Sequence, residues 1–262
     1  MGFKRIIRFQ NDFEQGQEKQ VNSTLETSDS SKNDTLKVEQ LERIWRPESP
    51  LECRIDPRSF EGEWIEHQPT TKRQEETMMI YQDAKDKGRL HPFTCMTIDP
   101  SVKDGKLVYQ KGMPIRTIFS YRQWEKMIIN YNLSRNSRMM TRTEYVCRNL
   151  FIIQKMVEES GYKIEVAWRK LCDASEEIGH YCDSDNFRER FEPTGSRNVC
   201  GFYDLGNAYK LIKEDPWKET RGFLAAGGDC LARGWESPVA DIGYLGDVDY
   251  VAKYGVGMLA MD

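Results

Sequence analysis

The sequence predicts a mainly α protein, of the α+β type with one small β-hairpin, whose irregular helical body follows a flexible N-terminal arm. Two observations favour this fold class: apolar residues recur at helical spacing through the second half of the chain, and helix-start signals precede them. Ser120 with Gln123 and Thr141 with Glu144 both fit the capping box, in which two side chains satisfy N–H groups of the first turn. The first half contains only one hairpin signal.

The helical body is expected over residues 116–262. One stripe is Val146, Leu150, Ile153 and Val157, and a second runs from Ile164 to Cys182 in steps of three and four. Residues Phe202 to Ile212 repeat the spacing, and Asp215-Pro216 fits the start of a further helix. The glycine-rich end predicts short helices mixed with tight turns or close backbone contacts.

Two regions precede this body. Residues 1–56 are expected to form a flexible arm, because 15–37 carries almost no apolar side chain, with one short helix over 36–45. Residues 57–115 form a small proline-punctuated region with a helix over 71–87. Its β-hairpin is expected to pair 93–99 with 106–110 around the turn signal Lys103-Asp104-Gly105.

Bulk properties exclude some classes of protein. The 262 residues carry a formal net charge of -4, so bulk charge alone cannot coat nucleic acid. No secretory signal and no apolar run long enough to span a membrane are visible. The seven cysteines are odd in number and form no C-x-x-C pair, which favours a reducing compartment and a cytoplasmic location.

The most informative stretch is Arg116 to Arg142, where six cations face a single anion, Glu125. Aromatic rings lie among these cations, and cations beside flat rings suit single-stranded nucleic acid. An alternative is that Trp124, Ile128 and Tyr131 form the buried face of a helix whose charges are solvated, and another is an acidic protein partner. The predicted nucleic-acid-binding residues are Arg116, Tyr121, Arg122, Trp124, Lys126, Arg135, Arg138 and Arg142.

Other constellations give weaker signals. Glu177 and His180, at i and i+3, can reach one point beside a helix, but no second such pair exists to complete a di-metal site. Asp183-Ser-Asp-Asn186 begins like a calcium loop and lacks its glycine. The sequence therefore predicts no metal and no cofactor, and no catalytic motif is recognised.

The leading hypothesis is a non-enzymatic assembly or scaffold protein, nucleocapsid- or packaging-like, that contacts nucleic acid and self-associates. Residues 236–262 carry a local charge of -4 and could dock on the basic stretch of the same or a neighbouring chain. The alternatives are a protein–protein interaction module and an enzyme with a dispersed site near Glu177 and His180.

Overall fold

The computed structural model describes residues 51–179, 181, 191–196, 198–220, 222–228, 233–246 and 255–262, without the side chains of 244–246. The chain divides into two units, residues 1–46 and 47–262. The first unit, and with it most of the predicted arm and its short helix, lies outside the described residues. All the described helices and strands belong to the second unit.

The described fold is α+β with four helices and four small sheets, so the prediction of a mainly α protein was wrong. The capping boxes predicted at Ser120 and Thr141 are both present, and Thr71 caps a third helix by accepting from the Gln74 N–H. The helices are α2 (Lys72–Asp86), α3 (Tyr121–Ile129), α4 (Arg142–Glu158) and α5 (Ile164–Cys172), with short 3-10 helices at Pro57–Ser59, Leu133–Arg135 and Ser175–Glu177. None of the helices in the described ranges is long and apolar enough to cross a membrane.

The first sheet draws its strands from both ends of the unit. Its order is β1-β2-β12-β5, and every neighbouring pair is antiparallel. The strands are β1 (Glu52–Ile55), β2 (Phe93–Met96), β12 (Leu259–Met261) and β5 (Arg138–Met139). Strand β5 lies within the basic stretch Arg116 to Arg142.

The second sheet has the order β10-β9-β8-β11, in which only β8 and β11 run parallel. Two further hairpins, β3–β4 and β6–β7, stand outside both sheets. The strands are β8 (Tyr209–Lys213), β9 (Phe223–Ala226), β10 (Ile242–Gly246), β11 (Gly255–Gly257), β3 (Ser101–Lys103), β4 (Lys106–Val108), β6 (Asn198–Val199) and β7 (Phe202–Tyr203).

Met258 joins the two sheets. It lies between β11 of the second sheet and β12 of the first, its N–H donates to the Leu211 carbonyl at 3.0 Å, and its carbonyl accepts from the Met140 N–H at 2.9 Å. The Lys213 N–H then donates to the Met140 carbonyl at 2.9 Å. The backbone hydrogen bonds thus continue from one sheet to the other.

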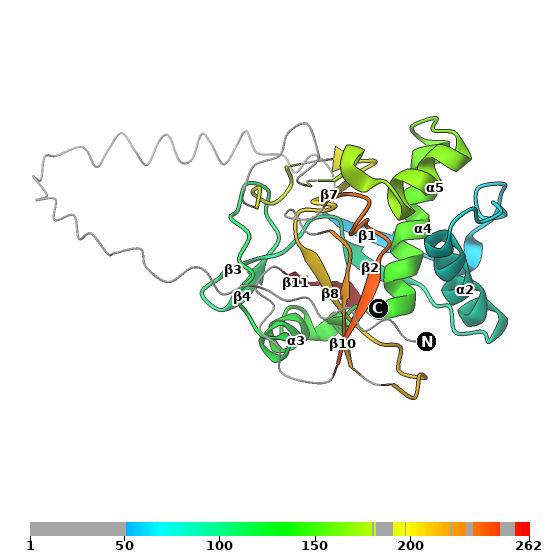
Figure 1. Ribbon diagram of the computed structural model, residues 1–262. Helices are drawn as coiled ribbons and strands as arrows, with labels where there is room; N and C mark the ends of the chain where they lie inside the picture. Colours follow the sequence, from blue (N-terminus) through cyan, green and yellow to red (C-terminus); the bar gives the residue numbers. More distant parts are fainter. Residues whose placement is uncertain are drawn as a thin grey trace, which may run out of the picture. The chain divides into compact units, whose positions relative to one another are not determined.

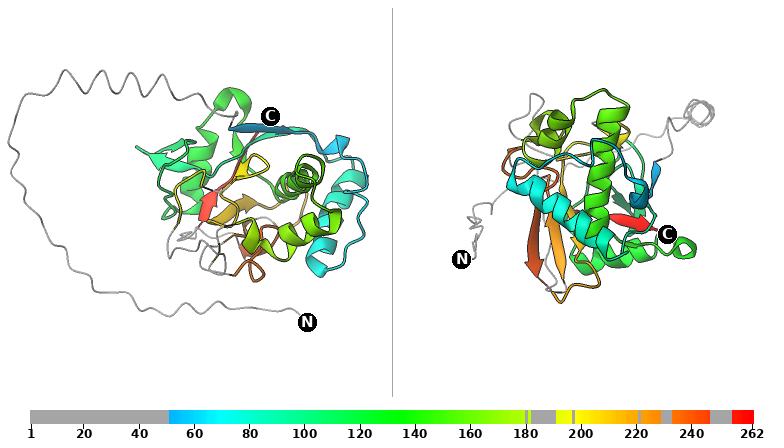
Figure 2. Two further views of the ribbon diagram at one scale, coloured as in Figure 1. Left: turned by 90° about the horizontal axis from the view of Figure 1, so that it is seen from above. Right: turned by 90° about the vertical axis from the view of Figure 1, so that its right-hand side faces the viewer.

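Helices cover the strands on two sides. Helices α2, α4 and α5 gather on one side, whereas α3 and the β3–β4 hairpin lie on the other (Figures 1 and 2). The larger apolar cluster is built around α4, and a second one packs α3 against β11, β12 and the β3–β4 hairpin. The basic stretch predicted to bind nucleic acid therefore begins on the α3 side.

Several predicted elements were wrong. Residues 202–212 form strands β7 and β8 in place of a helix, and turns follow Asp215-Pro216. The helix predicted from Ile164 to Cys182 ends as α5 at Cys172. Residues 93–96 form the predicted strand, but 106–108 pairs with 101–103 across the Asp104-Gly105 turn. Close backbone contact in the glycine-rich end is confirmed at Gly227, where a side chain would collide with the Pro238 carbonyl.

Candidate functional site

Helix α3 turns its aromatic residues into the protein. The Ser120 capping box starts the helix, and helical spacing then places Tyr121, Trp124 and Ile128 on its inner face. All three side chains have no exposed surface. The alternative to nucleic-acid contact was that Trp124, Ile128 and Tyr131 form the buried face of a helix. Trp124 and Ile128 are buried on α3 as that alternative predicts, whereas Tyr131 lies beyond the end of the helix and is half-buried.

The two rings predicted to stack on bases are held by other rings. Tyr121 stacks on Phe223 with ring centroids 4.5 Å apart, and Phe119 meets Trp124 edge to face at 5.5 Å. Stacking on a nucleotide needs an accessible ring face. Tyr121 and Trp124 therefore cannot take that role in the folded protein.

The last three arginines of the stretch, Arg135, Arg138 and Arg142, are bound within the chain. Arg135 donates to Glu52 at 2.6 Å, and an ion pair joins Arg142 to Glu214 at 3.5 Å. Arg138 binds Glu144 at 2.7 Å. Each of these guanidinium groups is therefore already engaged by an acidic side chain of the same chain.

Glu144 is the centre of the Arg138 network. Burial opposes ionisation of Glu144, but its hydrogen bonds with His91 and the Arg138 guanidinium outweigh burial and lower the pKa of its carboxyl. The same hydrogen bond, 3.1 Å between His91 Nε2 and Glu144 Oε1, raises the pKa of His91. Arg138 also donates to Asp262 at 3.2 Å. This network holds the start of α4 in place, and its carboxylates engage the Arg138 guanidinium.

The other three predicted cations remain available. Arg116, Arg122 and Lys126 are exposed, and no acidic side chain of the described ranges pairs with them. Glu125, the only anion of the stretch, pairs instead with Lys213. Arg122 and Lys126 are one helical turn apart and so lie on the same outer stripe of α3.

The β3–β4 hairpin adds two more cations. Lys103 and Lys106 are exposed, face each other across the turn and pair with no acid among the described residues. Val102 and Leu107 of this hairpin share an apolar cluster with α3, so the two elements are neighbours. Five cations therefore occur on adjoining elements, with Asp104 of the turn as the exposed anion.

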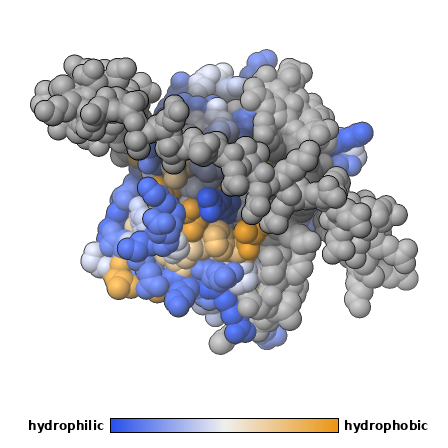
Figure 3. Space-filling view, turned by 90° about the vertical axis from the view of Figure 1, so that its left-hand side faces the viewer, coloured by the Kyte–Doolittle hydropathy of each residue, from blue (hydrophilic) through white to orange (hydrophobic). Residues whose placement is uncertain are grey.

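Exposed aliphatic side chains accompany these cations. Ile118 is 75% exposed, Leu133 is 72% exposed and Ile129 is 44% exposed, although each is large and apolar. Figure 3, which views the α3 side, shows an apolar area bordered by hydrophilic residues. We define the α3 face as Lys103, Lys106, Arg116, Ile118, Arg122, Lys126, Ile129 and Leu133.

A buried charged centre was missed by the sequence reasoning. Lys210 of β8 pairs with Asp99 and donates to the Asp204 carbonyl at 3.0 Å, and all three residues are buried. The Asp204 carboxylate accepts from the N–H groups of Asp99 and Gly195. Burial, together with the Asp99 charge, raises the pKa of Asp204 to about 7. The only sequence signal was a lysine inside an apolar strand.

The alternative site near Glu177 and His180 is not assembled within the described residues. Glu177 pairs with Lys170. His180 and the calcium-like run 183–186 lie outside the described residues. Across the described ranges, no three His, Cys, Asp or Glu side chains come together in a way that could hold a metal ion. The five cysteines described there are free thiols.

Comparison with known proteins gives little further information. No protein-family model matches the sequence, and no curated protein is similar to it. Among solved structures, the crystal structure of CarF is similar with a TM-score of 0.41 and 12% sequence identity, over 66% of this chain and 87% of CarF. A likeness this distant supports no argument about activity.

The helical character predicted for the body needs correction, because the described body is mixed α+β. Nothing in the comparisons or the fold supports a viral, RNA-binding or structural role. The predicted basic stretch contributes Arg116, Ile118, Arg122, Lys126, Ile129 and Leu133 to the α3 face.

Proposed function

We propose that this protein is a protein–protein interaction module whose α3 face binds an acidic, partly apolar segment of a partner protein. The observation that carries the proposal is the combination of five exposed, unpaired cations with three exposed aliphatic side chains on adjoining elements of the described chain. Solvated charges alone would not account for Ile118 and Leu133, which are large apolar side chains left in water.

The choice between a protein and a nucleic acid follows from the apolar part of this face. A single-stranded nucleic acid gains about 1–3 kcal/mol per base from stacking on an accessible ring. Tyr121 and Trp124 are buried and cannot supply that energy. Aliphatic side chains such as Ile118 and Leu133 gain instead from covering other apolar side chains, which an amphipathic acidic helix offers.

The two kinds of residue have different roles in this proposal. Fully burying one large aliphatic side chain contributes about 1.5–3 kcal/mol, so Ile118 and Leu133 supply most of the affinity. Cations at a solvated rim contribute about 0.2–1 kcal/mol each. Arg116, Arg122 and Lys126 therefore act mainly on orientation, on association rate and on rejection of basic partners.

Fluorescence anisotropy with three labelled probes tests the proposal. The probes are a synthetic helical peptide with glutamates on one face and leucines on the other, a polyglutamate peptide of equal length, and a single-stranded oligothymidylate. We expect the amphipathic peptide to bind tightest, because only this probe can use both halves of the face. Raising the salt concentration should weaken its binding without abolishing it.

Variants assign the binding to the α3 face. Replacing Arg116, Arg122 and Lys126 together by Ala should weaken binding of the amphipathic peptide about tenfold, which corresponds to about 1.4 kcal/mol. The matched control replaces Lys72, Lys163 and Arg169, exposed cations on α2 and α5, and makes the same change in net charge. This control should bind as the unchanged protein does.

Three outcomes would overturn the proposal. Tighter binding of the oligothymidylate than of the amphipathic peptide would assign the face to nucleic acid. Equal loss of binding in the α3 triple variant and its control would show a bulk charge effect. An increase of mass in solution that the Ile118→Ser/Leu133→Ser variant abolishes would assign the face to self-association.

A further inference from the structure

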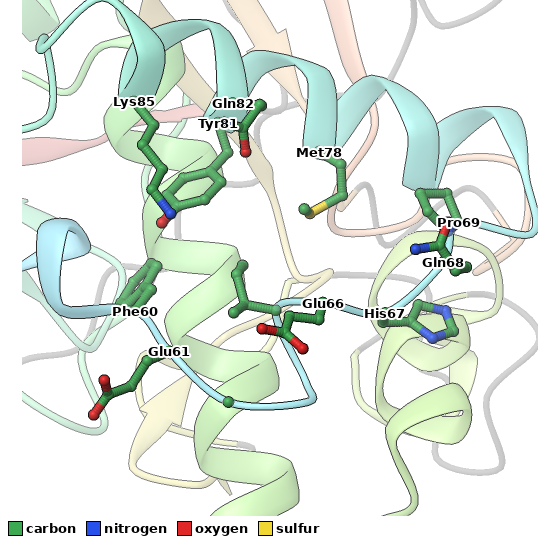
Figure 4. A pocket seen from close by; sticks show the side chains of 12 residues that line it. Phe60, Glu61, Glu66, His67, Gln68, Pro69, Met78, Tyr81, Gln82 and Lys85 are labelled. Carbon is green, nitrogen blue, oxygen red and sulfur yellow. The ribbon is translucent and has the colours of Figure 1, made fainter.

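A second candidate site lies beneath α2, on an element distinct from the α3 face. A hollow of about 540 Å³ opens between α2 and the segment 60–69 (Figure 4). That volume falls within the range of small-ligand sites, about 300–1,000 Å³. The hollow shares no lining residue with the α3 face.

The inner wall of the hollow is aromatic and fixed. Phe60 meets Trp64 edge to face with centroids 5.3 Å apart, and Tyr81 lies 5.9 Å from Phe60 at a tilted angle. The Tyr81 hydroxyl donates to the Pro57 carbonyl at 3.3 Å. Ile65 and Met78 extend the apolar wall. The rings are thus held in place before any ligand arrives.

Carboxylates from the segment 60–69 lie at the opening. Glu61 and Glu66 line the hollow, are exposed, and form no ion pair within the described part of the chain. His67 is engaged elsewhere, because its ring packs on Trp168 at 5.4 Å and its Nε2 lies 3.4 Å from Gln74 Oε1. Two unpaired anions beside an aromatic wall favour a cationic ligand.

The chain itself shows where an ammonium group fits. The Lys85 ammonium lies over the Tyr81 ring, 5.8 Å from its centroid, on the α2 side of the hollow (Figure 4). That distance is within the range of a cation–π interaction. Lys85 forms no ion pair with an acid of the described ranges, so the ring holds a cation without help from a carboxylate.

From these observations we infer that the hollow binds a primary ammonium group carried on an aliphatic chain, as in a lysine side chain. The chain lies along Phe60, Ile65 and Met78, while the ammonium group lies at the opening lined by Glu61 and Glu66. An anionic ligand is disfavoured, because the two carboxylates outnumber Lys85, the one lysine of the lining. A purely apolar ligand would leave both without a partner.

Titration of the protein with Nα-acetyl-lysine N-methylamide tests this inference. The reporter is the ε-methyl resonance of Met78 in protein labelled at methionine methyl groups, with Met127 of α3 as the distant reference. We expect the lysine probe to shift Met78 and to leave Met127 unchanged. The uncharged norleucine analogue should bind about tenfold more weakly or not at all, since it lacks the ammonium group.

Two variants give opposite expected changes. Glu61→Gln/Glu66→Gln should weaken binding about tenfold, because it removes both carboxylates while preserving the shape of the side chains. Lys85→Met should strengthen binding several-fold, because it removes a competing ammonium group and a like charge. Both substitutions are at exposed positions, so both variants should fold. A general loss of structure would weaken binding in both variants, so it cannot explain stronger binding in Lys85→Met together with weaker binding in Glu61→Gln/Glu66→Gln.

The source of the ammonium group is distinguished by a second pair of probes. Tighter binding of a lysine-containing peptide than of n-pentylamine assigns the hollow to a protein side chain, and the reverse order assigns it to a free amine. Equal binding of the lysine and norleucine probes overturns the inference, as does an unchanged affinity in Glu61→Gln/Glu66→Gln. Neither result depends on whether the α3 face binds a partner.

Discussion

Arg138 binds Glu144 with both arms of its guanidinium group: Nη1 donates to Oε2 at 2.8 Å while Nη2 lies 2.7 Å from Oε1. Bidentate pairs of this kind are among the strongest side-chain interactions. Glu144 is buried, so it depends on this partner far more than an exposed carboxylate would.

Arg138→Ala should therefore destabilise the protein by about 3 kcal/mol, the low end for breaking a buried pair, because Arg138 itself is partly exposed. Urea unfolding measures the loss. Arg138→Ala/Glu144→Gln should recover part of it, since glutamine removes the unpaired charge and can still complete the capping box with Thr141. Equal stability of the single and double variants would contradict this account.

The packing of α3 depends on a glycine in β11. A methyl group added at Gly257 would lie 2.9 Å from Ile128 Cδ1 and 3.1 Å from the Trp124 ring. We expect Gly257→Ala to cost about 1–3 kcal/mol by overpacking. Gly257→Ala/Ile128→Val should be less destabilised than the sum of its two single variants, because valine lacks Cδ1. Strict additivity in thermal unfolding would show that the clash is absent.

The inner and outer residues of α3 should respond differently to truncation. Trp124→Ala removes a fully buried ring and should cost about 3–5 kcal/mol. Arg122→Ala/Lys126→Ala on the outer stripe should change stability by no more than about 0.5 kcal/mol. Denaturant unfolding of both variants measures the contrast. Similar losses in the two would mean that the outer cations have intramolecular partners.

The buried centre around Asp204 predicts a pH dependence. The pKa of this carboxyl rises from 3.8 to about 7 on folding, so the folded state holds the proton more tightly. Its contribution to stability is complete below pH 4 and is lost as the pH rises to 7. The stability of the unchanged protein relative to Asp204→Asn should therefore fall across that window.

Unfolding free energies measured at several pH values check this expectation. Asp104→Asn, at the exposed turn of the β3–β4 hairpin, controls for the effect of replacing an aspartate elsewhere. A constant difference between the unchanged protein and Asp204→Asn from pH 4 to pH 7 would contradict the buried-proton account.

The helices were predictable because their signals are local. Thr71, Ser120 and Thr141 each stand at the start of a helix, and the cap is readable from neighbouring residues. The strands after residue 200 were not predictable in this way. Strand β8 is buried on both faces and lacks alternation, while Phe202 and Tyr209 fall by chance at helical spacing.

The candidate site was predictable only in part. The local excess of cations near α3 follows from the sequence, and Arg116, Arg122 and Lys126 remain exposed as expected. The engagement of Arg135 and Arg138 could not be foreseen, because their partners Glu52 and Asp262 lie at opposite ends of the described chain. Only the tertiary fold decides which charges of one stretch are neutralised.

The late position of β12 has a consequence for how the protein reaches its native state. This strand is inserted between β2 and β5, and its predecessor β11 completes the other sheet. Neither sheet is complete until residues 255–261 have paired with strands upstream in sequence. Such non-local pairing slows folding and couples both halves of the body into one cooperative transition. A destabilising substitution within residues 255–261 should therefore disrupt both sheets together.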